Sequence, residues 1–147
     1  MPEIKLSSDQ LSLMSMLTGI TGATARDCVI DDKLKRVIFV VAKGQMGLAI
    51  GKEGASIKKM ERVIKRPVEV VEWAEDVQGL VKNALGGRHI NDVKVTERED
   101  GTRAIVVMVD PRKKGAVLGL GGKNAERLRL LAKRHFDVTS IQITSET

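Results

Sequence analysis

The sequence predicts an α+β protein made of two copies of one unit, each a three-stranded sheet covered on one face by helices. Three observations predict this class. The chain matches itself at an offset of 68 residues. Helical and strand spacings of apolar residues follow in the same order in both copies. Apolar residues make up 42% of the chain, which is enough for a core and excludes extended disorder. We therefore expect two domains, 1–73 and 74–147.

The repeat is carried by glycines, apolar runs and basic pairs that coincide without a gap. Three glycines of the first copy fall on three of the second: Gly47, Gly51 and Gly54 on Gly115, Gly119 and Gly122. The other coincidences are VIFVV (37–41) with IVVMV (105–109), Lys65-Arg66 with Lys133-Arg134, Val68/Val70 with Phe136/Val138, and Leu17/Gly19 with Leu85/Gly87. One such coincidence could arise by chance, but the full set indicates a duplicated unit.

The first copy begins with a helix, because Ser7 or Ser8 with Gln10 forms a capping box before Leu11, Met14 and Leu17. Glycine ends it at Gly19 and Gly22. Turn residues and apolar spacing then predict strands 25–31 and 36–42, a short helix 45–50, a helix from Ala55 that ends before Pro67, and a strand from Val68 to Val71.

The second copy predicts the same order of elements. Gly86-Gly87 ends its first helix, Glu99-Asp100-Gly101 forms a turn, and Pro111 starts a short helix. The expected elements are a helix 74–85, strands 90–97 and 103–109, the short helix from Pro111, a glycine loop 119–122, a helix 123–135 and a strand 137–144.

The net charge of +6 hides an uneven distribution. Residues 43–66 carry +5 and residues 111–134 carry +7, so the rest of the chain carries −6. Both basic clusters surround glycine loops. Solvation alone explains basic residues, but it does not explain why they gather at the same place in both copies. A phosphate backbone as the partner explains both facts.

Each glycine loop joins two helices and suits the approach of a phosphate. Glycine has no Cβ, so another backbone can come close, and the free amides at the start of the next helix point at a bound anion. Two nucleotide-cofactor motifs fail. A P-loop ending in Gly51-Lys52 would need glycine at Met46 and Ser or Thr at Glu53. A dinucleotide fingerprint from Gly119 would need glycine at Asn124.

Composition excludes several other classes. No segment approaches 18 apolar residues and the N-terminus does not resemble a secretory signal, so we expect a cytoplasmic protein without membrane contact. Cys28 is the one cysteine, and His89 and His135 are the two histidines, so no metal site, cofactor or catalytic set is expected. We expect a protein that is not an enzyme and has no small-molecule substrate. Aromatic residues are only 2% of the chain, which argues against a stacking platform for bases.

The order of elements and the glycine loops resemble type II KH domains, whose hallmark is I-G-x-x-G between two helices, followed three positions on by an apolar residue. The first copy has Ile50-Gly51-Lys52-Glu53-Gly54 and then Ile57, and the second has Leu118-Gly119-Leu120-Gly121-Gly122. Two such units joined without a linker resemble the tandem KH pair of the NusA-type transcription termination and antitermination factors. The chain length is similar to the short archaeal form, which is the KH pair alone.

The resemblance implies that each loop clamps the backbone of single-stranded RNA beside an aliphatic groove for about four bases. Such a groove fits a chain with few aromatic residues. The first copy would contribute Ile50, Gly51, Lys52, Glu53, Gly54, Ile57, Lys58 and Lys59. The second would contribute Leu118, Gly119, Leu120, Gly121, Gly122 and Lys123, with Arg112, Lys113 and Lys114 supplying charge that its loop lacks.

By the same resemblance the process is transcription termination or antitermination, with RNA polymerase or the elongation complex as a further partner. Two alternatives remain open from the sequence. One is a KH adaptor in ribosome assembly or RNA decay, which the RNAs bound in cells would distinguish. The other is a protein-interaction scaffold that has lost RNA contact, which salt-insensitive binding of a partner would favour.

Overall fold

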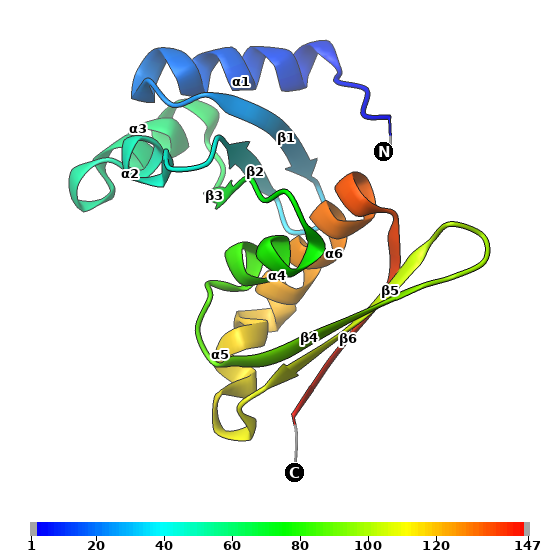
Figure 1. Cartoon of the computed structure of the whole chain (residues 1–147). Helices are drawn as coiled ribbons and strands as arrows, with labels where there is room; N and C mark the ends of the chain where they lie inside the picture. The colour runs from blue at the N-terminus through cyan, green and yellow to red at the C-terminus, as the bar shows by residue number, and fades with distance from the viewer. Residues whose placement is uncertain (1–2, 146–147) are drawn as a thin grey trace. The chain divides into compact units, whose positions relative to one another are not determined.

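The computed structural model describes residues 3–145, and these fold into two compact units (Figure 1). The first unit is Lys5–Trp73, and the second is built on the residues from Ala74 onward. The helices and strands of the first unit are α1 (Ser8–Thr21), β1 (Ala25–Asp31), β2 (Arg36–Val41), α2 (Met46–Ile50), a 3₁₀ turn (Lys52–Gly54), α3 (Ala55–Ile64) and β3 (Val68–Glu72). Within residues 3–145, no helix is long and apolar enough to cross a membrane.

The second unit repeats this order, which confirms the predicted α+β class. Its elements are α4 (Val77–Leu85), β4 (Ile90–Glu97), β5 (Arg103–Val109), a 3₁₀ turn (Pro111–Lys113), α5 (Lys114–Leu118), a second 3₁₀ turn (Leu120–Gly122), α6 (Lys123–Phe136) and β6 (Val138–Ser145). In each sheet the middle strand is antiparallel to the first strand and parallel to the third. The glycine loop therefore lies inside the crossover between two parallel strands.

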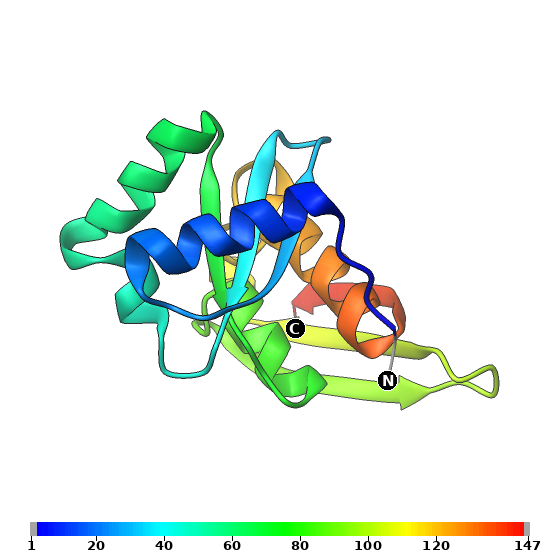
Figure 2. The ribbon, with the colours of Figure 1, turned by 90° about the horizontal axis from the view of Figure 1, so that it is seen from above.

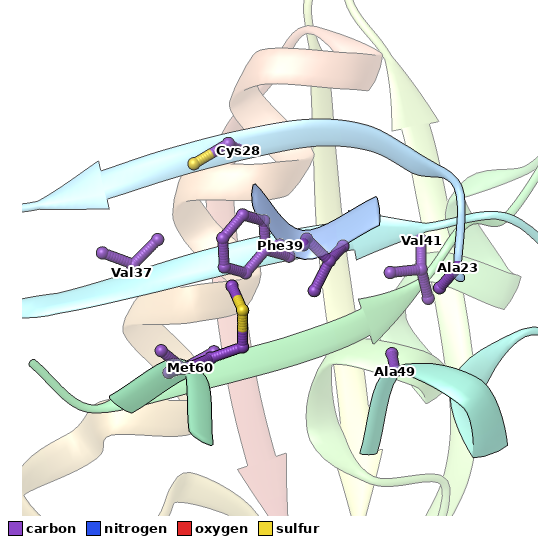
Figure 3. Close-up of a cluster of buried hydrophobic side chains, with 9 residues drawn as sticks. Ala23, Cys28, Val37, Phe39, Val41, Ala49 and Met60 are labelled. Atoms are coloured by element: carbon purple, nitrogen blue, oxygen red, sulfur yellow. The ribbon is translucent and has the colours of Figure 1, made fainter. Parts of the chain in front are cut away.

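The core of the first unit lies between its sheet and its three helices. Every residue of β2 is buried, and alternate ones, Val37, Phe39 and Val41, share a cluster with Leu17 of α1 and Met60 of α3 (Figure 3). Period-two alternation along β2 puts these three side chains on one face. That face is the one that α1, α2 and α3 cover, as Figure 2 shows for α1. The core thus fixes both helices that flank the first glycine loop.

Helix α1 begins as predicted and ends later than Gly19. The Ser7 hydroxyl accepts the Gln10 amide at 3.1 Å, and the Gln10 side chain accepts the Ser7 amide at 2.8 Å, which completes the capping box. The expectation that Gly19 stops the helix is wrong. Helix α1 continues because Ile20 packs against the core, and it stops at Gly22, which has a left-handed φ of 78°.

The predicted alignment of the two copies without gaps is correct from the middle strand through the glycine loop. It is wrong before the middle strand and after the start of the helix that follows the loop. Phe39 and Val107 are matched by the offset of 68 residues, but their partners in the hairpins, Cys28 and Val93, are only 65 residues apart. The second hairpin is therefore three residues longer than the first. Helix α3 has 10 residues and α6 has 14. The four extra residues add about one turn, which leaves the buried face of the helix in place.

As a result, several residues matched by the offset of 68 are not equivalent. Lys65 follows α3, whereas Lys133 and Arg134 lie inside α6, and Phe136 ends a helix instead of starting a strand. The capping glycines of the first helices, Gly22 and Gly86, are 64 residues apart, so Leu17 and Leu85 do not correspond either.

Two predicted boundaries of the second unit move by one to three residues. Helix α4 begins at Val77 instead of 74, because Asp76 is extended and its carboxylate accepts the Gly79 amide at 2.7 Å. Strand β6 begins at Val138, because Asp137 takes a left-handed φ of 55° at the end of α6.

Candidate nucleic-acid interface

The two glycine loops have nearly the same backbone although their sequences differ. Gly51 has φ 77° and ψ 169°, and Gly119 has φ 80° and ψ 165°. Each loop closes with the same hydrogen bond, from Gly54 N–H to the Gly51 carbonyl at 3.1 Å and from Gly122 N–H to the Gly119 carbonyl at 3.0 Å. The duplicated motif is therefore a duplicated conformation.

Glycine is required at the first position of each loop. A Cβ on Gly51 would lie 2.5 Å from Ser56 Oγ and 2.8 Å from the Ser56 backbone nitrogen. A Cβ on Gly119 would lie 2.8 Å from Cγ of Asn124. Both residues also have a positive φ with an extended ψ, a conformation open almost solely to glycine. Each loop thus folds closely against the first turn of the following helix.

The third position shows a difference in backbone strain. Glu53 has φ 55° and ψ 28°, and Gly121 has φ 65° and ψ 16°. A left-handed conformation is unfavourable for glutamate and free for glycine. The fold maintains the conformation of the first loop despite this strain.

The helices that follow both loops begin without a capping side chain. Their N-cap residues are Gly54 for α3 and Gly122 for α6, and neither has a side chain that could cap the helix. The first amides, those of Ala55 and Lys123, donate to the Lys52 and Leu120 carbonyls, and the amides that follow them have no side-chain cap. These amides and the positive end of the helix dipole together favour an anion. The backbone alone therefore provides the chemistry for a phosphate in both units.

Hydrogen bonds fix the segments that flank each loop. In the first unit, Glu72 accepts the Gly44 amide at 3.1 Å ahead of α2, and Glu61 of α3 accepts the Val68 amide of β3 at 2.9 Å. In the second unit, Asn124 Nδ2 donates to the Val117 carbonyl at 3.2 Å and joins the two sides of the loop. Both loops are therefore positioned by packed elements.

The predicted residues of the first loop differ in accessibility. Lys52, Glu53, Lys58 and Lys59 are exposed, so all three lysines can reach a ligand. Ile57 is half-buried and packs against the core, so only part of its side chain remains for a groove. The other three predicted residues, Ile50, Gly51 and Gly54, are half-buried, so each is partly open to solvent.

The second loop presents an apolar side chain where the first presents Lys52. Leu120 is 91% exposed, Leu118 and Gly119 are half-buried, and Gly121 is exposed. Around the loop, Lys123, Arg112 and Lys113 are exposed, and Lys114 and Gly122 are half-buried. The cations that we expected to replace a basic loop residue are thus accessible.

Arg112 has an acid beside it. The Asp110 carboxylate accepts the Arg112 amide at 3.0 Å and lies 3.5 Å from Arg112 Nε. The hydrogen bond from the Arg112 amide, helped by the Arg112 guanidinium, holds the pKa of Asp110 below its ordinary value. Arg112 is therefore partly neutralised, although its side chain is open to solvent.

Some basic residues of the two clusters have structural contacts that the sequence did not reveal. Arg127 donates to the Ala84 carbonyl at the end of α4, from Nε at 3.0 Å and from Nη2 at 2.6 Å. Arg129 pairs with Glu126 at 2.6 Å, and Arg66 pairs with Asp32 at 2.9 Å. Charge counts along the sequence include these residues, so they overstate the charge available to a ligand.

One exposed apolar side chain near the first loop was missed. Leu48 of α2 is 51% exposed, while its neighbour Ala49 is buried. Among residues 3–145, no group of three or more His, Cys, Asp or Glu side chains could hold a metal ion.

Comparison with known proteins supports the resemblance. A match to the KH domain family covers residues 15–99, which include the first glycine loop and leave out the second. A protein of Halobacterium salinarum named "Probable transcription termination protein NusA" is 38% identical over 141 residues, which are 96% of this chain and 99% of that protein. A protein of the same name from Methanocaldococcus jannaschii is 30% identical over 146 residues, 99% of this chain and 78% of that protein.

A solved structure is similar over both units. The crystal structure of APE1850 matches with a TM-score of 0.87 and 37% sequence identity, and it covers 95% of this chain and 100% of that one. The second unit, of which the KH domain match includes only residues 74–99, is therefore shared with this structure over its full length.

Proposed function

This chain belongs to the NusA family of KH-domain proteins, and from that premise we propose that it binds single-stranded RNA through two glycine-loop clamps during transcription termination or antitermination. We assign one type II KH domain to residues 1–73 and a second to residues 74–147. The protein acts in the cytoplasm as a binding factor without catalysis, and RNA polymerase or the elongation complex is its further partner.

The observation that carries this proposal is the common conformation of the two loops. Their first glycines agree to within a few degrees in φ and ψ, although the residues between the glycines differ completely. In the first loop this turn is kept although it strains Glu53, and packing alone does not explain why that cost persists. A ligand that contacts the backbone of both loops provides the common requirement.

In the proposed clamp each part has a separate task. The glycines let the sugar-phosphate backbone come close, and the uncapped amides at the start of α3 and α6 bind a phosphate. Lys52 adds charge to the first clamp. Ile50 and Leu118, both half-buried, line the aliphatic side of the grooves where bases lie.

The test is a double substitution, Lys52→Asp with Glu53→Asp. Both side chains are exposed, so the domain should fold, while two acids at the clamp should repel phosphate. The matched control is Lys33→Asp, an exposed site in the β1–β2 turn with the same change of charge. We expect fluorescence anisotropy to show much weaker binding of single-stranded RNA only for the clamp variant. Equal binding by this variant and the wild type would refute the clamp.

The process can be tested separately by crosslinking RNA to the protein in cells. Nascent transcripts recovered together with RNA polymerase are expected for a termination or antitermination factor. Ribosomal RNA as the main product would instead place the protein in ribosome assembly.

A further inference from the structure

Helix α3 and the residue that caps its C-terminus carry four exposed cations and no exposed acid. Lys58, Lys59, Arg62 and Lys65 are all exposed, and across residues 3–145 their side chains make no hydrogen bond or ion pair. We call these four residues the α3 basic face. The one acid of the helix, Glu61, is half-buried, and its carboxylate accepts the Val68 amide. The positive charge of this face is therefore not balanced by its own helix.

The stability of the fold accounts for only part of this arrangement. Arg62 and Lys65 lie at the C-terminal end of α3, where the helix dipole favours a cation. Lys58 and Arg62 are four residues apart on a helix, so their charges repel each other. Lys58 also lies in the first turn of α3, where the positive end of the helix dipole disfavours a cation. An anionic ligand would turn both unfavourable terms into favourable ones.

In the corresponding helix of the second unit, α6, two of the basic residues have partners within the protein. Arg129 of α6 pairs with Glu126, and Arg127 donates to the Ala84 carbonyl. The sequence assigns the larger charge, +7, to the second cluster. The contacts qualify this count, because three cations of the second cluster have partners within the protein, Arg112, Arg127 and Arg129, against Arg66 in the first.

We propose that the α3 basic face binds the phosphates of RNA nucleotides that flank the clamped ones, and that only the first unit has such a track. This inference rests on the proposed function. Gly54 of the clamp caps the start of α3 and Lys65 caps its end, so a strand that leaves the clamp along the helix meets the four cations in succession. Lys58 and Lys65 are about 10 Å apart along the helix axis, which is enough for more than one phosphate.

Length dependence of RNA binding tests the track. The variant is Arg62→Gln with Lys65→Gln, and the probes are labelled single-stranded RNAs of randomised sequence, 4 and 12 nucleotides long. We expect this variant to bind the 12-mer about fivefold more weakly, with a log-log salt slope smaller by about 1.4 for two lost phosphate contacts. Binding of the 4-mer should match the wild type, since the clamp is unchanged.

The control is Lys33→Gln with Lys94→Gln, two exposed lysines of the β1–β2 turn and of β4 that carry the same charge loss. The track is refuted if the variant binds the 12-mer like the wild type, or if the control loses as much affinity. The track is also refuted if the α3 basic face binds an acidic peptide while the variant binds the 12-mer as tightly as the wild type does. If the wild type binds neither RNA, the proposed function itself fails.

Discussion

Single glycines determine whether the loops can form. In Gly51→Ala, the new Cβ would overlap Ser56 in a left-handed backbone, so we expect a loss of about 1–3 kcal/mol in the free energy of unfolding. Gly47→Ala is the control, because a Cβ there meets nothing within 4 Å and lies inside α2. Alanine should stabilise this helix by about 1 kcal/mol. Urea unfolding followed by Trp73 fluorescence measures both, and equal effects would contradict the loop geometry.

Leu120 offers a gain-of-function test at one position. It is 91% exposed and occupies the place that Lys52 has in the first loop, so Leu120→Lys should not disturb the fold. We expect a new phosphate contact, tighter binding of single-stranded RNA and a salt slope steeper by about 0.7. Leu11→Lys is the control, since Leu11 is 50% exposed on α1. An unchanged slope for Leu120→Lys would mean that the second loop does not meet phosphate.

At the scale of elements, Arg127 and Lys59 are a matched pair that separates folding from binding. They occupy corresponding positions of α6 and α3, yet Arg127 joins α6 to α4 and Lys59 points to solvent. We expect Arg127→Met to reduce the stability of the second unit by about 1.5–3 kcal/mol, the range for a charged hydrogen bond. Lys59→Met should weaken RNA binding and leave stability unchanged. Hydrogen exchange of α4 and α6 amides measures the first effect, and the opposite pattern would contradict the assignment.

The sheet of the first unit contains an ion cluster that links stability to pH. Arg36 is 2% exposed and donates to Asp31 at 2.8 Å and to Glu69 at 3.1 Å. Burial raises the pKa of Asp31, but the hydrogen bonds from Arg36 and from the Leu34 and Lys33 amides outweigh it, so this pKa lies below its ordinary value. The carboxylate therefore stabilises the fold above the unfolded pKa of about 3.9, and this contribution disappears as the pH falls through the lower folded value.

Asp31→Asn should remove that pH dependence. We expect the variant to be less stable than the wild type at pH 7 and to lose less stability on acidification below about pH 4. Trp73 is the one tryptophan of the chain and belongs to the first unit, so its fluorescence reports this unit in urea titrations. Parallel stability curves for the two proteins would show that Asp31 is not the group responsible.

The elements were largely predictable because local signals were strong. The capping box at Ser7, the turn residues and the alternating apolar strands predicted every helix and strand within residues 3–145 to within a few residues. The sequence could not show that Gly19 lies inside α1. Whether a helix continues through a glycine depends on the packing of the neighbouring residues. It also hid the extra turn of α6, because an insertion of about one turn preserves the buried face.

The candidate site was predictable in its backbone and less so in its charges. Glycines at fixed spacing require a particular turn, so the loops could be located by sequence alone. The task of each cation depends on tertiary partners far away in the chain, such as the Ala84 carbonyl for Arg127. Periodicity carries no information on such contacts, so charge counts could not show which cations have partners within the protein.

At the scale of the whole molecule, the duplication has kept the loop conformation and changed its chemistry. The first loop combines Lys52 with the α3 basic face, while the second presents Leu120 between glycines. On the proposed function, two loops of one shape and unequal charge should differ in salt sensitivity, and the RNA affinity of the first unit should fall more steeply as ionic strength rises. The net charge of +6 is thus a poor guide to the interaction, which depends on the distribution of that charge.

The most direct test of the central claim is an NMR titration of the whole chain with single-stranded RNA. At 147 residues the backbone amides can be followed one by one. We predict that amides 51–55 and 119–123 shift together as RNA is added, because a phosphate bound at either loop changes the surroundings of these amides. If RNA binds while neither set of amides shifts, the glycine loops are not the clamps and the account is wrong.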